Sequence, residues 1–264
     1  PGWDALDAEK RQDKPEILLV IRDSDGNFVR EVTCPASKGF NRVSWDLRET
    51  STNAINIDRI SNASPSGLWA GPGTYTATLQ KRVDGVVTKL SGPVTFEVEK
   101  LYDGALKGAS KQELAEFWSY YGELRGASSA LNLALKDAEE KTKAMIAALN
   151  RTPQYPEGLY EDLHALKHEL HEIDEQLNGQ PSKREVGEKT RISINNRLRM
   201  SWSGANSTYG PTANHRKSLE IAAEEFEALR TNFEIIRSET IPNIEQALMN
   251  AGAPWMQGQP LPKK

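Results

Sequence analysis

The first hundred residues alternate between apolar and polar positions in short runs. The segment 42–48 places Val, Trp and Leu at every second position, and the segment 74–80 does the same with Tyr, Ala and Leu after a Gly-Pro-Gly turn. A period of two is typical of strands that bury one face. We therefore predict two strands, led by Trp45 and Tyr75, that form opposed walls of one small core.

Turn residues divide the rest of this region into hairpins. Asp25-Gly26 and Asp84-Gly85 each stand between apolar runs, and Asp-Gly is a strong signal for a two-residue hairpin turn. Further strands are predicted at 17–21, 28–32, 86–90 and 94–98. Six or seven short strands joined in this way predict an antiparallel immunoglobulin-like β-sandwich over residues 15–100.

From about residue 101 the apolar spacing changes to three and four residues, as in helices. Ser110 and Glu113 form a capping-box pattern, which predicts the start of a helix that continues to Leu149 and is about 60 Å long. Three more helices are predicted. One follows residue 156 and ends at 178, and one runs from about 182 to 202 with Val186, Ile194, Leu198 and Trp202 inward. The last starts near 212, is kinked or broken at Pro242 and is stopped by Gly252 and Pro254.

Short turns between these helices predict antiparallel neighbours. The fold class is therefore α+β and multidomain: the sandwich is followed by an elongated up-down α-helical bundle over 101–252 and a Pro-rich tail over 253–264. Residue 1 is Pro and the segment 1–14 is polar, so we expect it to lead in from an upstream region that is missing here.

Composition and charge restrict the class of partner. The 264 residues include 27% charged and 38% hydrophobic residues and carry a net charge of -4, without the basic excess that nucleic-acid binding requires. No apolar run approaches the roughly 20 residues of a membrane-spanning helix, so no transmembrane segment is predicted. Cys34 is the single cysteine, and we interpret it as a small buried apolar residue at a strand end.

Two patterns suggest metal sites and then depart from the required spacing. His164, His168 and His171 fall on one helix face, but Ala165 stands where a zinc protease has its glutamate, so exposed histidines are the preferred interpretation and opportunistic metal binding the alternative. The second pattern, Asp23-Ser-Asp-Gly-Asn27, begins like a calcium loop, but the required glutamate position falls on Cys34. We predict no metal site and no cofactor.

Aromatic residues in loops are the candidates for contact with a partner. Trp69 follows the long connection 49–69, and Trp202 and Tyr209 flank a polar Ser-, Gly- and Asn-containing loop. Trp69, together with Trp3 and Tyr102, also offers a platform for carbohydrate. Asp46 is interpreted as a surface or loop-bracing carboxylate, and no residue is assigned a catalytic role.

Three segments carry a resemblance to a known family. Residues 14–26, the run Gly39-Phe-Asn-Arg-Val-Ser-Trp-Asp-Leu-Arg48 and Gly71-Pro-Gly-Thr-Tyr75 resemble the C-terminal region of large secreted bacterial proteins. Those proteins carry sortilin-like or neuraminidase-repeat β-propellers and are often labelled glycosyl hydrolases. The segments 222–226 and 251–255 are similar to the helical tail of the same family, and the Trp-Asp and Gly-x-Tyr strands also resemble the immunoglobulin-like domain of flagellar hook-capping proteins.

The resemblance implies an extracellular or periplasmic, cell-envelope setting. It leads to the hypothesis of a non-catalytic accessory region that packs against the upstream β-propeller or another envelope protein and mediates assembly. A carbohydrate-binding module of a secreted glycoside hydrolase is the alternative, and a metal-dependent enzyme using the three histidines is a third. Whether the chain is an enzyme stays open, with no activity expected of this region.

Overall fold

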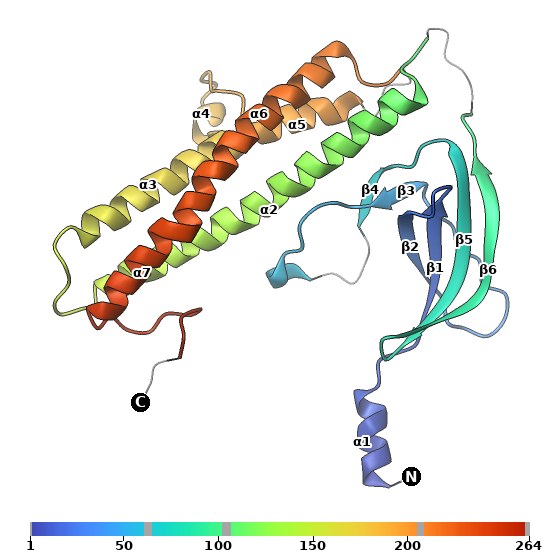
Figure 1. Cartoon of the computed structure of the whole chain (residues 1–264), viewed down its shortest axis with the longest axis horizontal. Helices are drawn as coiled ribbons and strands as arrows, with labels where there is room; N and C mark the ends of the chain where they lie inside the picture. Colours follow the sequence, from blue (N-terminus) through green and yellow to red (C-terminus); the bar gives the residue numbers. More distant parts are fainter. Residues whose placement is uncertain (1, 61–64, 102–106, 205–208, 262–264) are drawn as a thin grey trace. The chain divides into compact units, whose positions relative to one another are not determined.

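The computed structural model describes residues 2–60, 65–101, 107–204 and 209–261. The chain divides into two compact units, which are described separately. A β unit comprises Pro1–Thr52 and Arg59–Trp118, and a helical unit comprises Asn53–Asp58 and Ser119–Lys264. The protein is therefore α+β, with the antiparallel sheets in one unit and most of the helices in the other (Figure 1).

Four antiparallel strands form the main sheet of the β unit in the order β2-β1-β5-β6. Their bounds are β1 (Glu16–Asp23), β2 (Phe28–Cys34), β5 (Gly73–Val83) and β6 (Val86–Val98). Both predicted Asp-Gly hairpins are confirmed: Gly26 lies at φ 83°, and Asp84 and Gly85 lie at φ 47° and 76°. Positive φ at both central residues matches the right-handed twist of the strands that the second turn joins.

A second sheet pairs β3 (Arg48–Thr50) with β4 (Ser66–Trp69). The predicted strand over 42–48 is wrong, because residues 41–46 form no strand and Leu47 takes a left-handed backbone with φ 58°. The carboxylate of Asp46 accepts the backbone N–H of Arg48 at 3.1 Å, which favours this turn over an extended chain. The strand therefore begins only at Arg48.

The core of the β unit contains the two predicted aromatic residues. Ile21, Val29 and Tyr75 are buried together, and Trp45 and Phe96 pack against them. Arg30 is also buried, at 8% exposure, and its guanidinium group donates to the backbone oxygens of Glu49 and Pro65. These bonds tie β2 to β3 and to the residue that precedes β4.

The N-terminal segment contains a helix, α1 (Trp3–Arg11), that the sequence pattern did not predict. None of its residues is buried, and Trp3 is 82% exposed. A short 3-10 turn, η1 (Ile57–Arg59), lies in the connection between β3 and β4.

The first long helix, α2 (Lys111–Leu149), has 39 residues and follows the predicted bounds closely. The capping box is confirmed, since the Ser110 N–H donates to the Glu113 carboxylate at 2.8 Å and the Glu113 N–H donates to the Ser110 hydroxyl at 3.2 Å. The next helix, α3 (Leu159–Asn178), buries the predicted apolar stripe of Leu159, Leu163, Leu166, Leu170, Ile173 and Leu177.

The predicted helix over 182–202 is wrong in its first half. The structure has a five-residue helix, α4 (Pro181–Glu185), and then an irregular segment before α5 (Ile194–Ser203). Gly187 lies at φ 74°, which ends the helical path, and Val186 is 75% exposed instead of inward. The helix α5 starts afresh at Ser193, whose hydroxyl accepts the Asn196 N–H at 3.3 Å.

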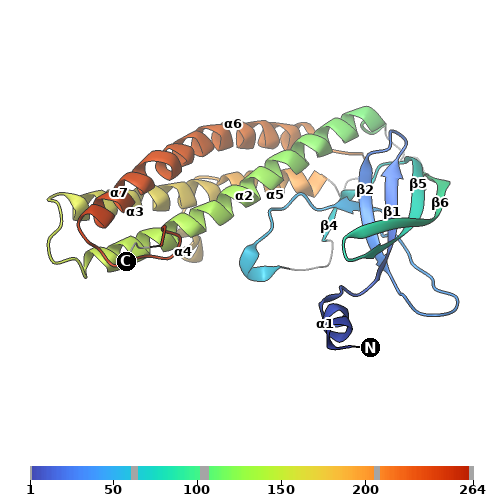
Figure 2. The same ribbon diagram turned by 60° about the horizontal axis from the view of Figure 1, so that its bottom comes forward.

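The last helical stretch consists of α6 (Ala213–Ile235), the π-helical turn η3 (Ile236–Thr240) and α7 (Ile241–Asn250). The irregularity expected at Pro242 is confirmed, because the π turn directly precedes it. In the helical unit, α2, α3 and α6 run side by side in both views (Figures 1 and 2). No helix among the described residues is long and apolar enough to cross a membrane.

Candidate functional site

The helical unit contains a polar groove of about 350 Å³. We call it the Trp202 groove. Two guanidinium groups, three carboxamides, two hydroxyls and one indole line it, from Asn53, Arg125, Ser128, Ser129, Asn132, Asn195, Arg199 and Trp202. Among the predicted partner-binding residues, Trp202 is the member of this groove.

One wall of the groove is a polar stripe on α2. Arg125, Ser129 and Asn132 follow one another at steps of four and three, so they share a helix face. The segment 53–58 is held along this face: Arg125 Nε donates to Asn53 Oδ1 at 3.3 Å, and the Ala54 N–H donates to Ser129 Oγ at 3.2 Å.

A relay of carboxamides connects the α2 wall to the opposite wall, which α5 forms. Ser128 Oγ donates to Asn195 Oδ1 at 2.9 Å, and Asn195 Nδ2 donates to Asn178 Oδ1 at 2.7 Å. Asn178 Nδ2 in turn donates to Asn132 Oδ1 at 2.8 Å. The relay joins α2, α5 and the C-terminal end of α3, so the positions of Asn132 and Asn195 are set by three helices together.

Each of these bonds occupies one acceptor position on a carboxamide oxygen of the lining, so that N–H donors remain in excess. The side-chain oxygens of Asn53, Asn132 and Asn195 each accept a hydrogen bond from within the protein. Arg125 also donates to the Tyr121 hydroxyl, and Arg199 donates to Asn196, so both cations contact neutral partners. The groove is therefore positively charged and rich in hydrogen-bond donors.

The indole of Trp202 is half-buried and lies against the ring of Tyr121, with 5.7 Å between ring centroids. Burial raises the pKa of the Tyr121 hydroxyl, although the hydrogen bond from Arg125 acts in the opposite direction. Tyr121 is thus a neutral, packed support for the aromatic wall.

The other two predicted partner-binding residues do not join this groove. Trp69 ends β4 in the β unit, and the guanidinium carbon of Arg48 lies 3.8 Å from the centroid of its ring, a cation–π contact. Tyr209 is exposed, and residues 205–208 of the loop before it lie outside the described residues. Tyr102, considered for a carbohydrate platform, also lies outside them.

The three histidines do not converge on a metal site. His164 and His168 have ring centroids 4.5 Å apart, and His171 Nε2 lies 3.4 Å from the Glu175 carboxylate. Within the part of the chain that the structure describes, no group of three or more His, Cys, Asp or Glu side chains is placed to hold a metal ion. His168 and His171 instead line a largely apolar groove of about 440 Å³ between α2 and α3.

The carboxylate of Asp23, considered for calcium, serves the hairpin turn. It accepts the N–H groups of Asp25 and Asn27 at 3.0 and 2.8 Å and the side-chain amide of Asn27 at 2.9 Å. Partial burial acts to raise the pKa of Asp23, but these hydrogen bonds outweigh it and lower the pKa below its usual value. Cys34 is a free thiol at the end of β2, and burial raises its pKa.

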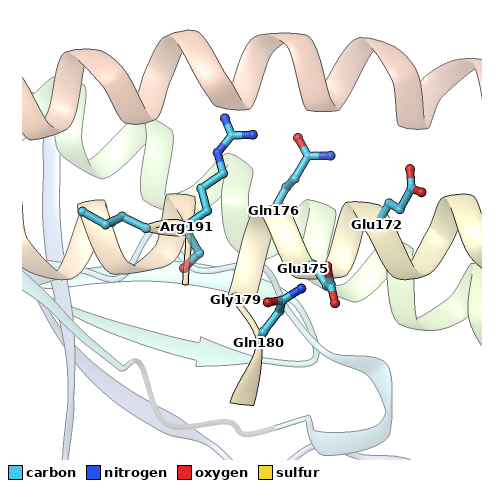
Figure 3. A pocket seen from close by; sticks show the side chains of 8 residues that line it. Glu172, Glu175, Gln176, Gly179, Gln180 and Arg191 are labelled. Carbon is cyan, nitrogen blue, oxygen red and sulfur yellow. The ribbon is translucent and has the colours of Figure 1, made fainter. Parts of the chain in front are cut away.

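A smaller cavity of about 260 Å³ lies at the C-terminal end of α3. Figure 3 shows Glu172, Gln176 and Arg191 extending from α3 and from the segment that precedes α5. Arg191 forms an ion pair with Glu225 at 3.0 Å, and Arg197 pairs with the same carboxylate at 3.1 Å. The Arg191 side chain is thus engaged in joining the segment before α5 to α6, which makes the cavity a weaker candidate than the Trp202 groove.

The β unit carries a second kind of candidate surface. β6 is the edge of the main sheet (Figure 1), and Val86, Val87 and Leu90 on it are exposed. Exposed apolar side chains on an edge strand are typical of a protein-binding surface, because the edge also presents unpaired backbone groups. We call the segment 86–91 the β6 edge.

Reasoning from the sequence missed most of the groove. One feature of the sequence could have indicated the α2 wall. Polar residues recur at helical spacing within the predicted first helix, at Arg125, Ser129, Asn132 and Lys136. Nothing in the sequence indicated that Asn195 and Arg199 would face this stripe. In comparisons with protein-family models, curated proteins and solved structures, nothing matches this chain.

Proposed function

We propose that this chain is a non-catalytic interaction region of a larger secreted or cell-envelope protein that carries a β-propeller. Its role is domain packing or protein assembly. The observation that carries the proposal is the β6 edge, a segment of an outermost strand of the sheet on which the large apolar side chains of Val86, Val87 and Leu90 remain exposed.

The finer assignment of the fold belongs to the same proposal. We regard the β unit as an immunoglobulin-like sandwich in which the β3–β4 sheet covers part of the four-stranded sheet. The contact of Trp45, which lies in the segment before β3, with Tyr75 of β5 supports it. We regard the helical unit as an elongated up-down bundle, supported by the length of α2 and by the buried stripes of α3 and α6.

Strand addition is the binding mode that this edge favours. Pro93 has no backbone N–H, which interrupts pairing at that position, and we assign the pairing with a partner strand to the residues before it, those of the β6 edge. Main-chain hydrogen bonds would supply affinity, and the exposed Val87 and Leu90 would supply apolar contacts. The occupant is a strand of the propeller or of another envelope β protein.

The test is a pull-down from the envelope fraction of the source, with the whole chain as bait and mass spectrometry to identify partners. Val87→Lys and Leu90→Lys place a charge on the edge, which opposes strand addition. We expect a specific β-rich partner that the unmodified chain captures and that both variants lose.

Val186→Lys is the matched control, because Val186 is also an exposed valine but lies in the helical unit. This variant should capture the partner as the unmodified chain does. Equal capture by all three variants, each shown folded by circular dichroism, would reject the β6 edge. Capture of glycan without any protein would reject the assembly role and favour the carbohydrate-binding alternative.

A further inference from the structure

We propose that the Trp202 groove binds an anionic saccharide, a sugar unit that carries a carboxylate or a sulfate. The inference concerns the helical unit alone and does not depend on the β6 edge. It rests on the hydrogen-bond inventory of the groove, on its charge and on its aromatic wall.

The inventory selects a ligand that accepts hydrogen bonds. The carboxamide oxygens of Asn53, Asn132 and Asn195 already accept bonds from Arg125, Asn178 and Ser128. The groups left to face a ligand are mainly donors: the remaining N–H groups of the two guanidinium groups, the amide nitrogen of Asn132 and the hydroxyl of Ser129. Carboxylate, sulfate and sugar hydroxyl oxygens are the matching acceptors.

The charge of the groove selects an anion among these ligands. Arg125 and Arg199 contribute two positive charges, and the eight lining residues include no carboxylate. A guanidinium group donates two parallel hydrogen bonds to a planar carboxylate or to two sulfate oxygens, in a geometry that adds specificity as well as affinity. Arg191, by contrast, is already paired with a carboxylate in the neighbouring cavity.

The aromatic wall and the size of the groove select a sugar over an isolated ion. Trp202 offers an apolar ring surface beside the polar groups, and its contact with Tyr121 supports that ring. Cavities of about 300 to 1,000 Å³ are typical of small-molecule sites, and the groove has about 350 Å³. One sugar ring with its charged substituent fits this combination of a flat apolar wall and clustered donors.

The groove is formed before a ligand arrives. The relay from Ser128 through Asn195 and Asn178 to Asn132 fixes two carboxamides, and Asn53 is held by Arg125. Groups that are already oriented lose little conformational freedom on binding, so weak individual hydrogen bonds can add up to measurable affinity.

Isothermal titration calorimetry with the whole chain tests the proposal. The probes are trigalacturonate as the carboxylated saccharide, a sulfated heparin disaccharide, and maltotriose as the neutral control. We expect at least one anionic probe to bind ten times or more tightly than maltotriose, and to bind less tightly as salt is raised. The heparin disaccharide carries a uronate carboxylate as well as sulfate, so tighter binding of this probe than of trigalacturonate would indicate that the groove recognises sulfate.

Variants then locate the binding. Arg125→Gln and Arg199→Gln should each weaken the anionic probe by about tenfold or more, because each removes a charge-assisted donor. Arg230→Gln removes an arginine of α6 that is paired with Glu227 away from the groove, and it should leave binding unchanged. Trp202→Ala should weaken all saccharide binding while inorganic sulfate, titrated separately, is unaffected.

Three results would overturn the proposal: maltotriose binding as tightly as both anionic probes, binding that is insensitive to both arginine variants, or no binding of any probe by the folded chain. Because the β6 variants are not used, these results are independent of the assembly test.

Discussion

The ring of Trp45 stands edge-on to the ring of Tyr75, with 5.3 Å between the centroids and 62° between the planes. Trp45 Nε1 donates to the Arg48 carbonyl at 2.8 Å, and the Tyr75 hydroxyl donates to the Gly71 carbonyl at 2.6 Å. The polar atom of each side chain thus has a hydrogen-bond partner, while the apolar part of each ring packs in the core. The pair holds a segment without regular structure against the main sheet.

Trp45→Ala should therefore destabilise the β unit more than its partial exposure suggests. Loss of the packing with Tyr75 and Phe96 is expected to lower the free energy of unfolding by about 2–3 kcal/mol, near the low end of values for large aromatic truncations. Urea unfolding followed by circular dichroism measures this. Trp45→Phe keeps a ring but loses the hydrogen bond to Arg48, so it should lose less; equal losses in the two variants would contradict the ring contact.

Arg30 provides a second test of the link between the two sheets. Its Nη1 donates to the Glu49 and Pro65 carbonyls at 3.1 and 2.7 Å, and its Nη2 donates to the Ser66 hydroxyl at 3.4 Å. Arg30→Lys keeps the charge but not the planar fork, and should cost about 1–3 kcal/mol of stability. Arg42→Lys makes the same change at an exposed position and should cost almost nothing. A similar loss of stability in the Arg30→Lys and Arg42→Lys variants would contradict the role of Arg30 in linking the two sheets.

Asp46 makes a prediction about pH. Partial burial acts to raise its pKa, but hydrogen bonds from the Ser66 hydroxyl and the Arg48 N–H, with the charge of Arg30, lower it below the ordinary value of 3.8. The unfolded state then binds the proton more readily, so Asp46 stabilises the fold above that value and the contribution disappears as pH falls through the lower, folded value.

Asp46→Asn should thus be less stable than the unmodified chain near neutral pH. The difference should shrink below pH 3.8, as measured by thermal unfolding across a pH series. Asp7→Asn on α1 serves as the control and should run parallel to the unmodified chain. A stability difference that stays constant down to the lowest pH would show that the charge of Asp46 is not involved.

The substitution Gly204→Ala tests whether helix propensity or packing against His215 decides the change in stability, because the two effects have opposite signs. The backbone of Gly204 is ordinary helix, with φ -65°, so helix propensity alone predicts that Gly204→Ala stabilises the chain by about 1 kcal/mol. A Cβ there would lie 2.8 Å from Nδ1 of His215, which accepts the Thr212 N–H at the start of α6. We therefore expect destabilisation by roughly 1–3 kcal/mol, from overpacking and a displaced cap.

Thermal unfolding with Gly71→Ala as the comparison checks the Gly204 prediction, because a Cβ at Gly71 meets nothing within 4 Å. A stabilised Gly204→Ala variant would mean that the His215 ring moves away freely. His215→Ala should itself weaken the start of α6, because it removes the ring nitrogen that accepts the Thr212 N–H. It also removes the contact of Nε2 with the Ser203 hydroxyl at 3.2 Å.

Local patterns predicted the parts of the fold whose physics is local. The six-residue stripe of α3, the Ser110–Glu113 capping box and both Asp-Gly hairpins follow from side chains near one another in the sequence. The pattern failed over 42–48, where the alternation is real but Leu47 turns the chain. It also failed at Val186, because α4 ends at Glu185 and Gly187 takes a left-handed backbone that prevents the helix from continuing.

The Trp202 groove could not be predicted because its residues come together only through helix packing. Arg125 and Arg199 are far apart in sequence, and their shared cavity depends on how α5 packs beside α2. The sequence predicts Asn178 only as the end of a helix, but in the structure its side chain forms hydrogen bonds with both Asn195 and Asn132. Trp202 was predicted at the end of a helix, next to a polar loop. It does lie on α5, but its place in the wall of a groove was not predicted.

The relay makes the last prediction. The Ser128 hydroxyl is buried, at 1% exposure, and donates to Asn195 at 2.9 Å. Asn195→Ala leaves this donor without its acceptor and should destabilise the helical unit by about 1–3 kcal/mol. Ser128→Ala removes the donor, so the double variant should lose less than the sum of the two single variants. Urea unfolding of all four chains in a double-mutant cycle gives the coupling. Additive losses would mean that Ser128 and Asn195 do not act as a hydrogen-bonded pair in solution.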